Sequence, residues 1–249
     1  MFLVIEGLDG SGKSTVTRFI GHLLSVWSID RVVTRESGGT PVGQCIRKLY
    51  LDKDIPMQPC TEVLLAYADR SEHIETVIWP ALKAGKMVIS DRFAESTYAL
   101  QASTEEAQSL ARLLYLKATK GCFPDLTIYL RISPELSLQR VDDRGGKKDK
   151  MESRPLSFQS SVAERYEERL GALTRCVEID AEQELAEVLF NVVEQLTKFF
   201  KAQALLSTQP WATRWRGDCD VAEALGLCLA HRYAEDPVKV DQEFETVPM

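Results

Sequence analysis

Short apolar segments alternate with longer amphipathic segments through the first 200 or so residues of the chain. Five apolar runs are typical of buried strands, and they cover residues 2–6, 31–34, 87–91, 126–130 and 176–179. The intervening and following patterns predict helices over 13–27, 59–84, 105–120, 134–141, 156–173 and 184–200. Near-continuous apolar strands separated by helices are typical of a parallel sheet covered on both faces. The pattern therefore predicts a doubly wound α/β domain with a five-stranded parallel sheet.

The character of the sequence changes after Lys201. A break at 207–210 is followed by Trp211 and Trp215 among basic residues, and Asp218 is placed to cap a short helix that ends at Tyr233. Residues 235–249 carry five acidic side chains and one lysine. We expect one domain over residues 1–203 and a C-terminal extension over 204–249, with a mobile acidic end.

Composition narrows the class of protein. The chain has 249 residues, 45% of them hydrophobic and 27% charged, and its net charge is −7. These proportions are ordinary for a globular protein, and the acidic balance argues against a nucleic-acid coat, which needs a basic face. No run approaches the ~20 apolar residues of a membrane helix, and the first residues lack the pattern of a signal peptide. We therefore expect a cytoplasmic protein with neither membrane nor nucleic acid as a partner.

The six cysteines are scattered and include no Cys-x-x-Cys pair. Reduced thiols are the expected state of such cysteines in a reducing compartment. Cys219, Cys228 and His231 are close in sequence, but their spacing fits no familiar metal-ligand pattern.

A glycine-rich segment follows the first predicted strand and opens the first predicted helix. It matches the Walker A pattern G-x-x-x-x-G-K-[ST] in the strand–loop–helix context that the pattern requires. Glycines let successive backbone N–H groups surround phosphate oxygens, and the start of the helix adds partial positive charge. Lys13 is then expected to reach the terminal phosphates and Ser14 to ligate Mg²⁺. The loop consists of Gly7, Leu8, Asp9, Gly10, Ser11, Gly12, Lys13 and Ser14.

A Walker A loop is common to kinases, GTPases and ATPases, so it does not by itself identify the class of protein. Three arginines elsewhere in the chain help to distinguish these classes. Arg35 follows the second predicted strand, Arg92 ends the third beside Asp91, and Arg70 lies on the long predicted helix. The carboxyl ends of parallel strands meet in one crevice, so these side chains are expected to converge beside the loop. Because the guanidinium fork matches phosphate oxygens, several arginines in one crevice indicate a second phosphorylated ligand.

These segments resemble the thymidylate kinases, which are P-loop enzymes that phosphorylate dTMP. The resemblance spans roughly residues 1–200 and follows the order of the family's motifs. It is carried by 6–15, 34–40, 68–70, 77–82, 91–93, Ser96 and Thr97 with Gln101, 124–127, and Arg144 and Gly145 with Asp149 and Glu152. The resemblance implies a P-loop kinase fold, ATP and Mg²⁺ as cofactors, and a homodimer packed through long helices.

The family's functional residues carry over to matching positions of this sequence. On the donor side, the resemblance implies that the loop from Gly7 to Thr15 and also Arg140 bind ATP, and that Ser14 and Asp91 hold Mg²⁺. On the acceptor side, it implies a substrate-binding set of Asp9, Arg35, Ala66, Arg70, Arg92, Ser96, Leu100 and Gln101. The residues that it implies for catalysis are Lys13, Asp91, Arg92 and Arg144.

Residues 140–154 correspond to a lid that closes over ATP in the family. Because Ser11 in the phosphate loop is uncharged, the catalytic arginine is expected from this lid, as in the bacterial-type members. Arg144 is the first candidate and Arg140 the second. The alternative is a solvated charge run, since Asp142, Asp143, Asp149 and Glu152 lie among the basic residues.

Five positions depart from the family pattern: Ser37 replaces proline, Ala66 a phenylalanine that stacks on thymine, Leu100 tyrosine, Ala102 glycine and Lys150 a lid arginine. The first four cluster around the nucleoside pocket, so the departures bear on base specificity rather than on ATP. The sequence thus predicts transfer of the γ-phosphoryl group of ATP to dTMP. The alternatives are a kinase for another or 5-modified deoxypyrimidine monophosphate, and a nucleotide-binding module that has lost catalysis.

Overall fold

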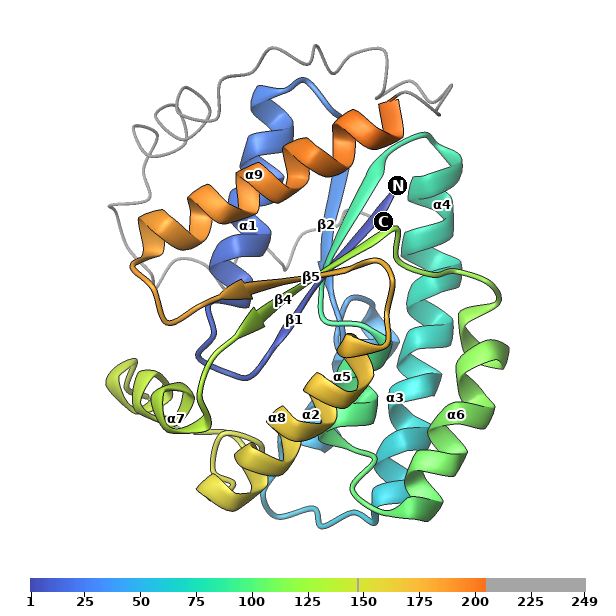
Figure 1. The fold of residues 1–249 in the computed structure, drawn as a ribbon. Coiled ribbons are helices and arrows are strands. Elements are labelled where there is room, and N and C mark those ends of the chain that lie inside the picture. Colours follow the sequence, from blue (N-terminus) through green and yellow to red (C-terminus); the bar gives the residue numbers. More distant parts are fainter. Residues whose placement is uncertain (147, 205–249) are drawn as a thin grey trace.

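The central sheet of the computed structural model has five parallel strands in the order β2-β3-β1-β4-β5 (Figure 1). The strands are β1 (Phe2–Gly7), β2 (Arg31–Arg35), β3 (Met87–Asp91), β4 (Leu126–Arg131) and β5 (Cys176–Asp180). Each lies within a residue of the run predicted for it, so the doubly wound parallel architecture is confirmed. The structure describes residues 1–146 and 148–204, and the features predicted over 205–249 lie outside that range.

Helices cover both faces of the sheet. On one side lie α1 (Lys13–Val26) and α9 (Leu185–Ala204), and on the other α3 (Pro59–His73), α4 (Trp79–Lys83), α5 (Ala94–Leu100), α6 (Glu105–Thr119) and α8 (Leu156–Gly171) (Figure 1). Alternate residues of β1 enter different clusters: Leu3 and Ile5 pack with α1, whereas Phe2 and Val4 pack under α4. All four are at most 1% exposed. Burial of each such side chain contributes about 1.5–3 kcal/mol, which explains why β1 is apolar on both faces from Phe2 to Ile5.

The long helix predicted over 59–84 is divided in the structure. It runs as α3, a π-helical turn over Ile74–Ile78 and then α4. Pro80 stands near the start of α4, where its missing N–H and its ring are incompatible with a regular i→i−4 bond. Local widening of the helix to a π turn accommodates the proline while the helix axis continues.

Two helices were not predicted: α2 (Pro41–Leu51) and α5. The Thr40 side chain caps α2 by accepting a hydrogen bond from the Gly43 N–H at 2.9 Å, and Pro41 occupies the first turn. A threonine cap followed by proline is a recognised helix-start signal. Helix α5 has only seven residues, and six of them are buried, including polar ones. It therefore lacks the alternation of apolar buried and polar exposed positions that predicts a helix.

The register of the strands brings the predicted site residues to one edge of the sheet. Ile5 of β1 and Arg35 of β2 both lie opposite Asp91 of β3. The phosphate loop, the turn after Arg35 and the Asp91–Arg92 step therefore share one crevice. Within the described residues, no helix is both long enough and apolar enough to cross a bilayer.

Candidate active site

The phosphate loop leaves the amino end of α1 open. Gly10 and Gly12 have φ values of 78° and 90°, in the left-handed region that glycine tolerates best. Gly12 is the N-cap residue of α1, and no side chain caps the helix there. Next to it the Ser11 hydroxyl is buried without a hydrogen-bond partner among the described residues. Uncapped N–H groups and an unsatisfied hydroxyl at a helix start fit a bound phosphate.

Lys13 lies buried across this loop. Its ammonium donates to the Leu8 carbonyl oxygen at 2.6 Å and stands 3.7 Å from the Asp9 carboxylate. Burial, and after it the nearby Arg92 cation, lower the pKa of Lys13 to about 8. Triphosphate oxygens would stabilise the charged form and hold it beside the loop.

The residues predicted to hold Mg²⁺ touch each other. The Ser14 hydroxyl donates to the Asp91 carboxylate at 2.8 Å. A hydroxyl and a carboxylate are oxygen ligands of the kind that Mg²⁺ prefers, and this ion usually takes few protein ligands and several water or phosphate oxygens. Among the residues that the structure describes, no group of three or more His, Cys, Asp or Glu side chains forms a metal cage. The donor set therefore fits Mg²⁺ shared with a nucleotide.

Arg92 is fixed between the loop and the crevice. Its Nη2 donates to Asp9 at 2.5 Å, and its Nη1 donates to the Gly7 carbonyl oxygen, Ser96 and Tyr166 at 2.9–3.1 Å. Its φ of 73° is unusual for a residue with a side chain. Partial burial would raise the pKa of Asp9, but Arg92 and Lys13 lower it to about 2. The loop and the crevice are thus joined by an ion pair that survives at any ordinary pH.

A buried carboxylate, Glu6, supports this arginine from behind. It accepts from the Phe93 and Ser96 N–H groups at 2.8 and 3.3 Å, from the Ser96 hydroxyl at 2.5 Å and from the Tyr166 hydroxyl at 3.1 Å. A guanidinium only donates, so hydroxyls that accept from Arg92 direct their own protons toward Glu6. Burial raises the pKa of Glu6 to about 7. Glu6 and Tyr166 therefore orient Arg92.

Arg70 is held at the other end of the crevice. Its Nε donates to Glu36 at 2.9 Å, and its Nη2 lies 2.8 Å from Glu36 and 2.9 Å from the Thr97 hydroxyl. The guanidinium also packs over the rings of Tyr67 and Phe93, at 4.7 and 5.0 Å from their centroids. Its Nη1 is buried without a hydrogen-bond partner among the described residues. A buried donor of this kind is costly unless a ligand accepts from it.

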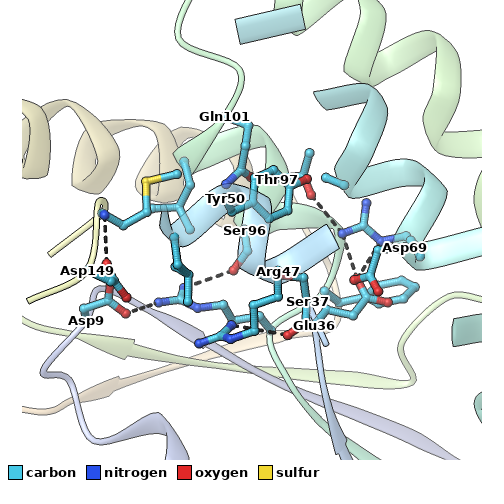
Figure 2. Close-up of a pocket in the computed structure, with 17 residues that line it drawn as sticks. Asp9, Glu36, Ser37, Arg47, Tyr50, Asp69, Ser96, Thr97, Gln101 and Asp149 are labelled. Carbon is cyan, nitrogen blue, oxygen red and sulfur yellow. Dashed lines mark hydrogen bonds and ion pairs between the residues drawn. The ribbon is translucent and has the colours of Figure 1, made fainter. Parts of the chain in front are cut away.

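The crevice brings most of the predicted acceptor-side residues together. Asp9 and Asp149 lie at one end of it and Asp69 at the other, with Ser96, Thr97 and Gln101 between them (Figure 2). Of the residues predicted for the acceptor, those that line the crevice are Asp9, Ala66, Arg70, Arg92, Ser96, Leu100 and Gln101. Tyr67 is not among the lining residues, as its helical position predicts, because it packs beneath Arg70.

Arg35, Arg140 and Arg144 do not line the crevice. Arg35 ends β2 at the same edge of the sheet, opposite Asp91 and close enough to Arg47 to affect its pKa. Arg140, on α7 (Pro134–Asp143), donates to the Ala181 carbonyl oxygen at 2.8 Å, and Arg144 is 62% exposed and paired with Glu152. The two α7-side arginines thus stand near the phosphate loop, where α7 packs on Gly10, without entering the acceptor site.

Sequence reasoning missed several lining residues, above all Arg47. It lies on the unpredicted helix α2 and donates to the Ser37 carbonyl oxygen at 3.2 Å. Burial lowers the pKa of Arg47, and the neighbouring Arg35 and Arg92 cations lower it further, while Asp149 and Asp9 oppose them. Three cations in one place indicate an anion site. The Thr40-Pro41 helix start was the signal that could have placed Arg47 on a helix facing the crevice.

Comparison with known proteins agrees with this geometry. Residues 5–192 match the family model of thymidylate kinase. The chain is similar to the thymidylate kinase of Alkalilimnicola ehrlichii, with 39% identity over 205 residues that cover 78% of this chain and 91% of the relative. It is also 39% identical over 204 residues to that of Blochmanniella pennsylvanica, with 80% and 96% covered, and 38% identical over 206 residues to that of Nitrosomonas eutropha, with 82% and 95% covered. The chain therefore belongs to the thymidylate kinase family of nucleoside monophosphate kinases.

Proposed function

We propose that the chain transfers the γ-phosphoryl group of ATP to dTMP and forms dTDP and ADP. The observation that carries this proposal is Arg92, which is bonded to Asp9 of the phosphate loop and also lines the crevice. A donor phosphate on the loop and an acceptor phosphate at Arg92 would therefore be adjacent. Membership of the family supports dTMP as the acceptor and ATP as the donor.

Positioning and charge stabilisation supply the catalysis in this proposal. Lys13 and the open amino end of α1 bind the donor phosphates, and Arg47 and Arg92 bind the acceptor phosphate. Ser14 and Asp91 would hold Mg²⁺, which when bound neutralises charge on the phosphates. No general base is required, because the acceptor oxygen is already ionised. Arg144 would add positive charge to the transferred group from the exposed side.

A panel of acceptors tests the proposal. Purified protein is mixed with ATP, Mg²⁺ and each deoxynucleoside monophosphate in turn, and ADP formation is followed. We expect turnover with dTMP well above that with dAMP, dGMP or dCMP. Equal, acceptor-independent ADP formation would indicate an ATPase, and nucleotide binding without turnover would indicate the inactive module.

A second acceptor class is favoured by the apolar part of the crevice. Ala66 and Leu100 line it where the family carries aromatic rings, and the lining residues nearby include Leu51 and Met151. A methyl group at position 66 leaves room beside the base that a ring would fill. We propose that the chain also phosphorylates 5-substituted deoxyuridine monophosphates. The acceptor panel should therefore include 5-hydroxymethyl-dUMP.

A homodimer is supported by the outer faces of α3 and α6. Leu64 of α3 is 51% exposed, and Leu113 and Leu116 of α6 are 69% and 67% exposed. Helices α3 and α6 pack against each other, and exposed leucines on two packed helices are typical of a protein interface. We expect light scattering to give twice the chain mass, and Leu113→Asp with Leu116→Asp to give the monomer.

A cytoplasmic location is the proposal that the thiols support. Four cysteines lie within the part of the chain that the structure describes, and all four, Cys45, Cys60, Cys122 and Cys176, are free. Free thiols are the normal state in the reducing cytoplasm, which supports a cytoplasmic kinase.

A further inference from the structure

Lys150 replaces a lid arginine of the family, but the structure places it against the acceptor side of the crevice. Its ammonium lies 3.2 Å from the Glu62 carboxylate and donates to the Ile55 carbonyl oxygen at 3.1 Å. Its backbone N–H donates to the Leu51 carbonyl oxygen at 3.3 Å. The Lys150 side chain is only 12% exposed and that of Glu62 only 6%. The Lys150 side chain is therefore held by Glu62 of α3 and by Ile55, which lies between α2 and α3.

The residues on either side of Lys150 form a turn of fixed shape. The Asp149 carboxylate accepts from the Met151 and Glu152 N–H groups at 2.8 and 2.9 Å, which is a capped turn. The Gln159 side chain of α8 donates to the Met151 carbonyl oxygen at 3.4 Å. Because the turn is stiff, the position of Lys150 sets the positions of Asp149 and Met151, and both of these line the acceptor crevice.

Glu62, the partner of Lys150, lies on a helix that lines the acceptor crevice. Glu62 lies in the first turn of α3, and its carbonyl oxygen accepts from the Tyr50 hydroxyl at 2.8 Å. Ala66 and Arg70 follow on the same helix at four-residue steps and line the crevice. The Lys150–Glu62 contact thus joins the helix that carries one wall of the acceptor site to the turn that carries the opposite wall.

We infer that Lys150 is a positioning residue of the acceptor site, which holds Asp149 and Met151 against the bound deoxynucleoside monophosphate through its contacts with Glu62, Ile55 and Leu51. The inference rests on the proposed function for the identity of the ligand, and it goes beyond that function by giving this segment a role toward the acceptor. The nearby Lys148 provides a contrast, because it is 38% exposed and pairs with Asp142 of α7 instead. Within the described residues, the ion pair of Lys148 leads to α7, and Asp142 does not line the crevice.

Steady-state kinetics on four variants tests the inference. Lys150→Ala and Glu62→Gln are expected to raise the KM for dTMP roughly tenfold each, because a desolvated charge loses its partner, and to change the KM for ATP less than twofold. The double variant Lys150→Glu with Glu62→Lys restores the ion pair with reversed sign but not the bond to Ile55, so it should recover part of the loss. Lys148→Ala, the matched control, should behave as the native chain. An effect on the KM for ATP alone, an equal effect of Lys148→Ala, or no recovery in the double variant would overturn the inference.

Hydrogen exchange separates this inference from the proposed function, because it needs neither substrate nor turnover. In the protein without nucleotide, the amides of Lys150, Met151 and Glu152 should be protected, and Lys150→Ala should lower that protection while Lys148→Ala keeps it. Unprotected amides in the native chain would contradict the contact itself. Protection without any phosphorylation of dTMP would retain the contact and refute the proposed acceptor, and calorimetric titration with dTMP then shows whether the crevice binds that nucleotide.

Discussion

The arginines of the acceptor crevice and those that follow α7 are held in opposite ways. The Arg92 side chain is 13% exposed and bonds to four oxygen atoms, whereas that of Arg144 is 62% exposed and meets one carboxylate. A guanidinium that the protein has already desolvated and aimed needs no reorganisation when the substrate arrives. An exposed one must first leave water and Glu152. If the proposed roles hold, the fixed Arg92 binds the acceptor and the exposed Arg144 acts on the transferred phosphoryl group.

The largest loss should come from the phosphate loop, whose buried Lys13 is as fixed as Arg92. Lys13→Ala removes the loop cation proposed to contact the donor phosphates, and loss of such a preorganised donor typically lowers kcat by ~10²–10³-fold. Turnover is measured with saturating ATP and dTMP, and circular dichroism verifies the fold. A folded Lys13→Ala protein with near-native turnover would contradict the assignment of Lys13 to the mechanism.

The pH dependence of stability tests the burial of Glu6, the carboxylate behind Arg92. Its pKa of about 7 exceeds its ordinary value, so the folded chain binds this proton more tightly than the unfolded chain. The free energy of unfolding should therefore fall as pH rises between about 4.5 and 7, by about 3 kcal/mol from this group. Glu6→Gln should remove that part of the slope. Urea denaturation of both proteins at several pH values measures it, and identical slopes would show that Glu6 does not titrate there.

Arg144→Ala tests the exposed region. Because Arg144 reaches the phosphates only after leaving Glu152, we expect kcat to fall about 10–100-fold while the KM for ATP changes little. The control is Arg175→Ala, which removes a similarly exposed arginine paired with Asp125. A raised KM for ATP with native kcat would assign Arg144 to ground-state binding. Arg144 and Arg92 would then both act in binding, and the proposed difference between them would be wrong.

The smallest expected effect concerns the base. Ala66→Phe adds a ring beside the base, and stacking of this kind contributes roughly 1–3 kcal/mol in other nucleic-acid sites. The ratio of kcat/KM for dTMP to that for 5-hydroxymethyl-dUMP should rise about tenfold. Ala66→Leu fills space without an aromatic face and separates stacking from volume. Strong native selectivity for dTMP that neither variant changes would show that another group closes the pocket.

The parts of the molecule that could be predicted are those whose structure depends on residues close together in the sequence. The five strands follow from apolar runs, and the phosphate loop follows from glycines at fixed spacing. Arg47 and Tyr166 were missed because their roles depend on how α2 and α8 pack, which no local pattern reports. The contacts of Lys150 were not predicted for the same reason, since its partner Glu62 lies 88 positions earlier in the sequence.

The left-handed backbone at Arg92 makes this position intolerant of change in an asymmetric way. A residue with a side chain costs about 1–2 kcal/mol in that conformation, and glycine does not. Every replacement loses the guanidinium, and glycine, which relieves the strain most fully, also leaves Asp9 and Glu6 without their organising cation. Backbone relaxation and positive charge therefore favour different residues at this one position, because glycine supplies the first and arginine the second.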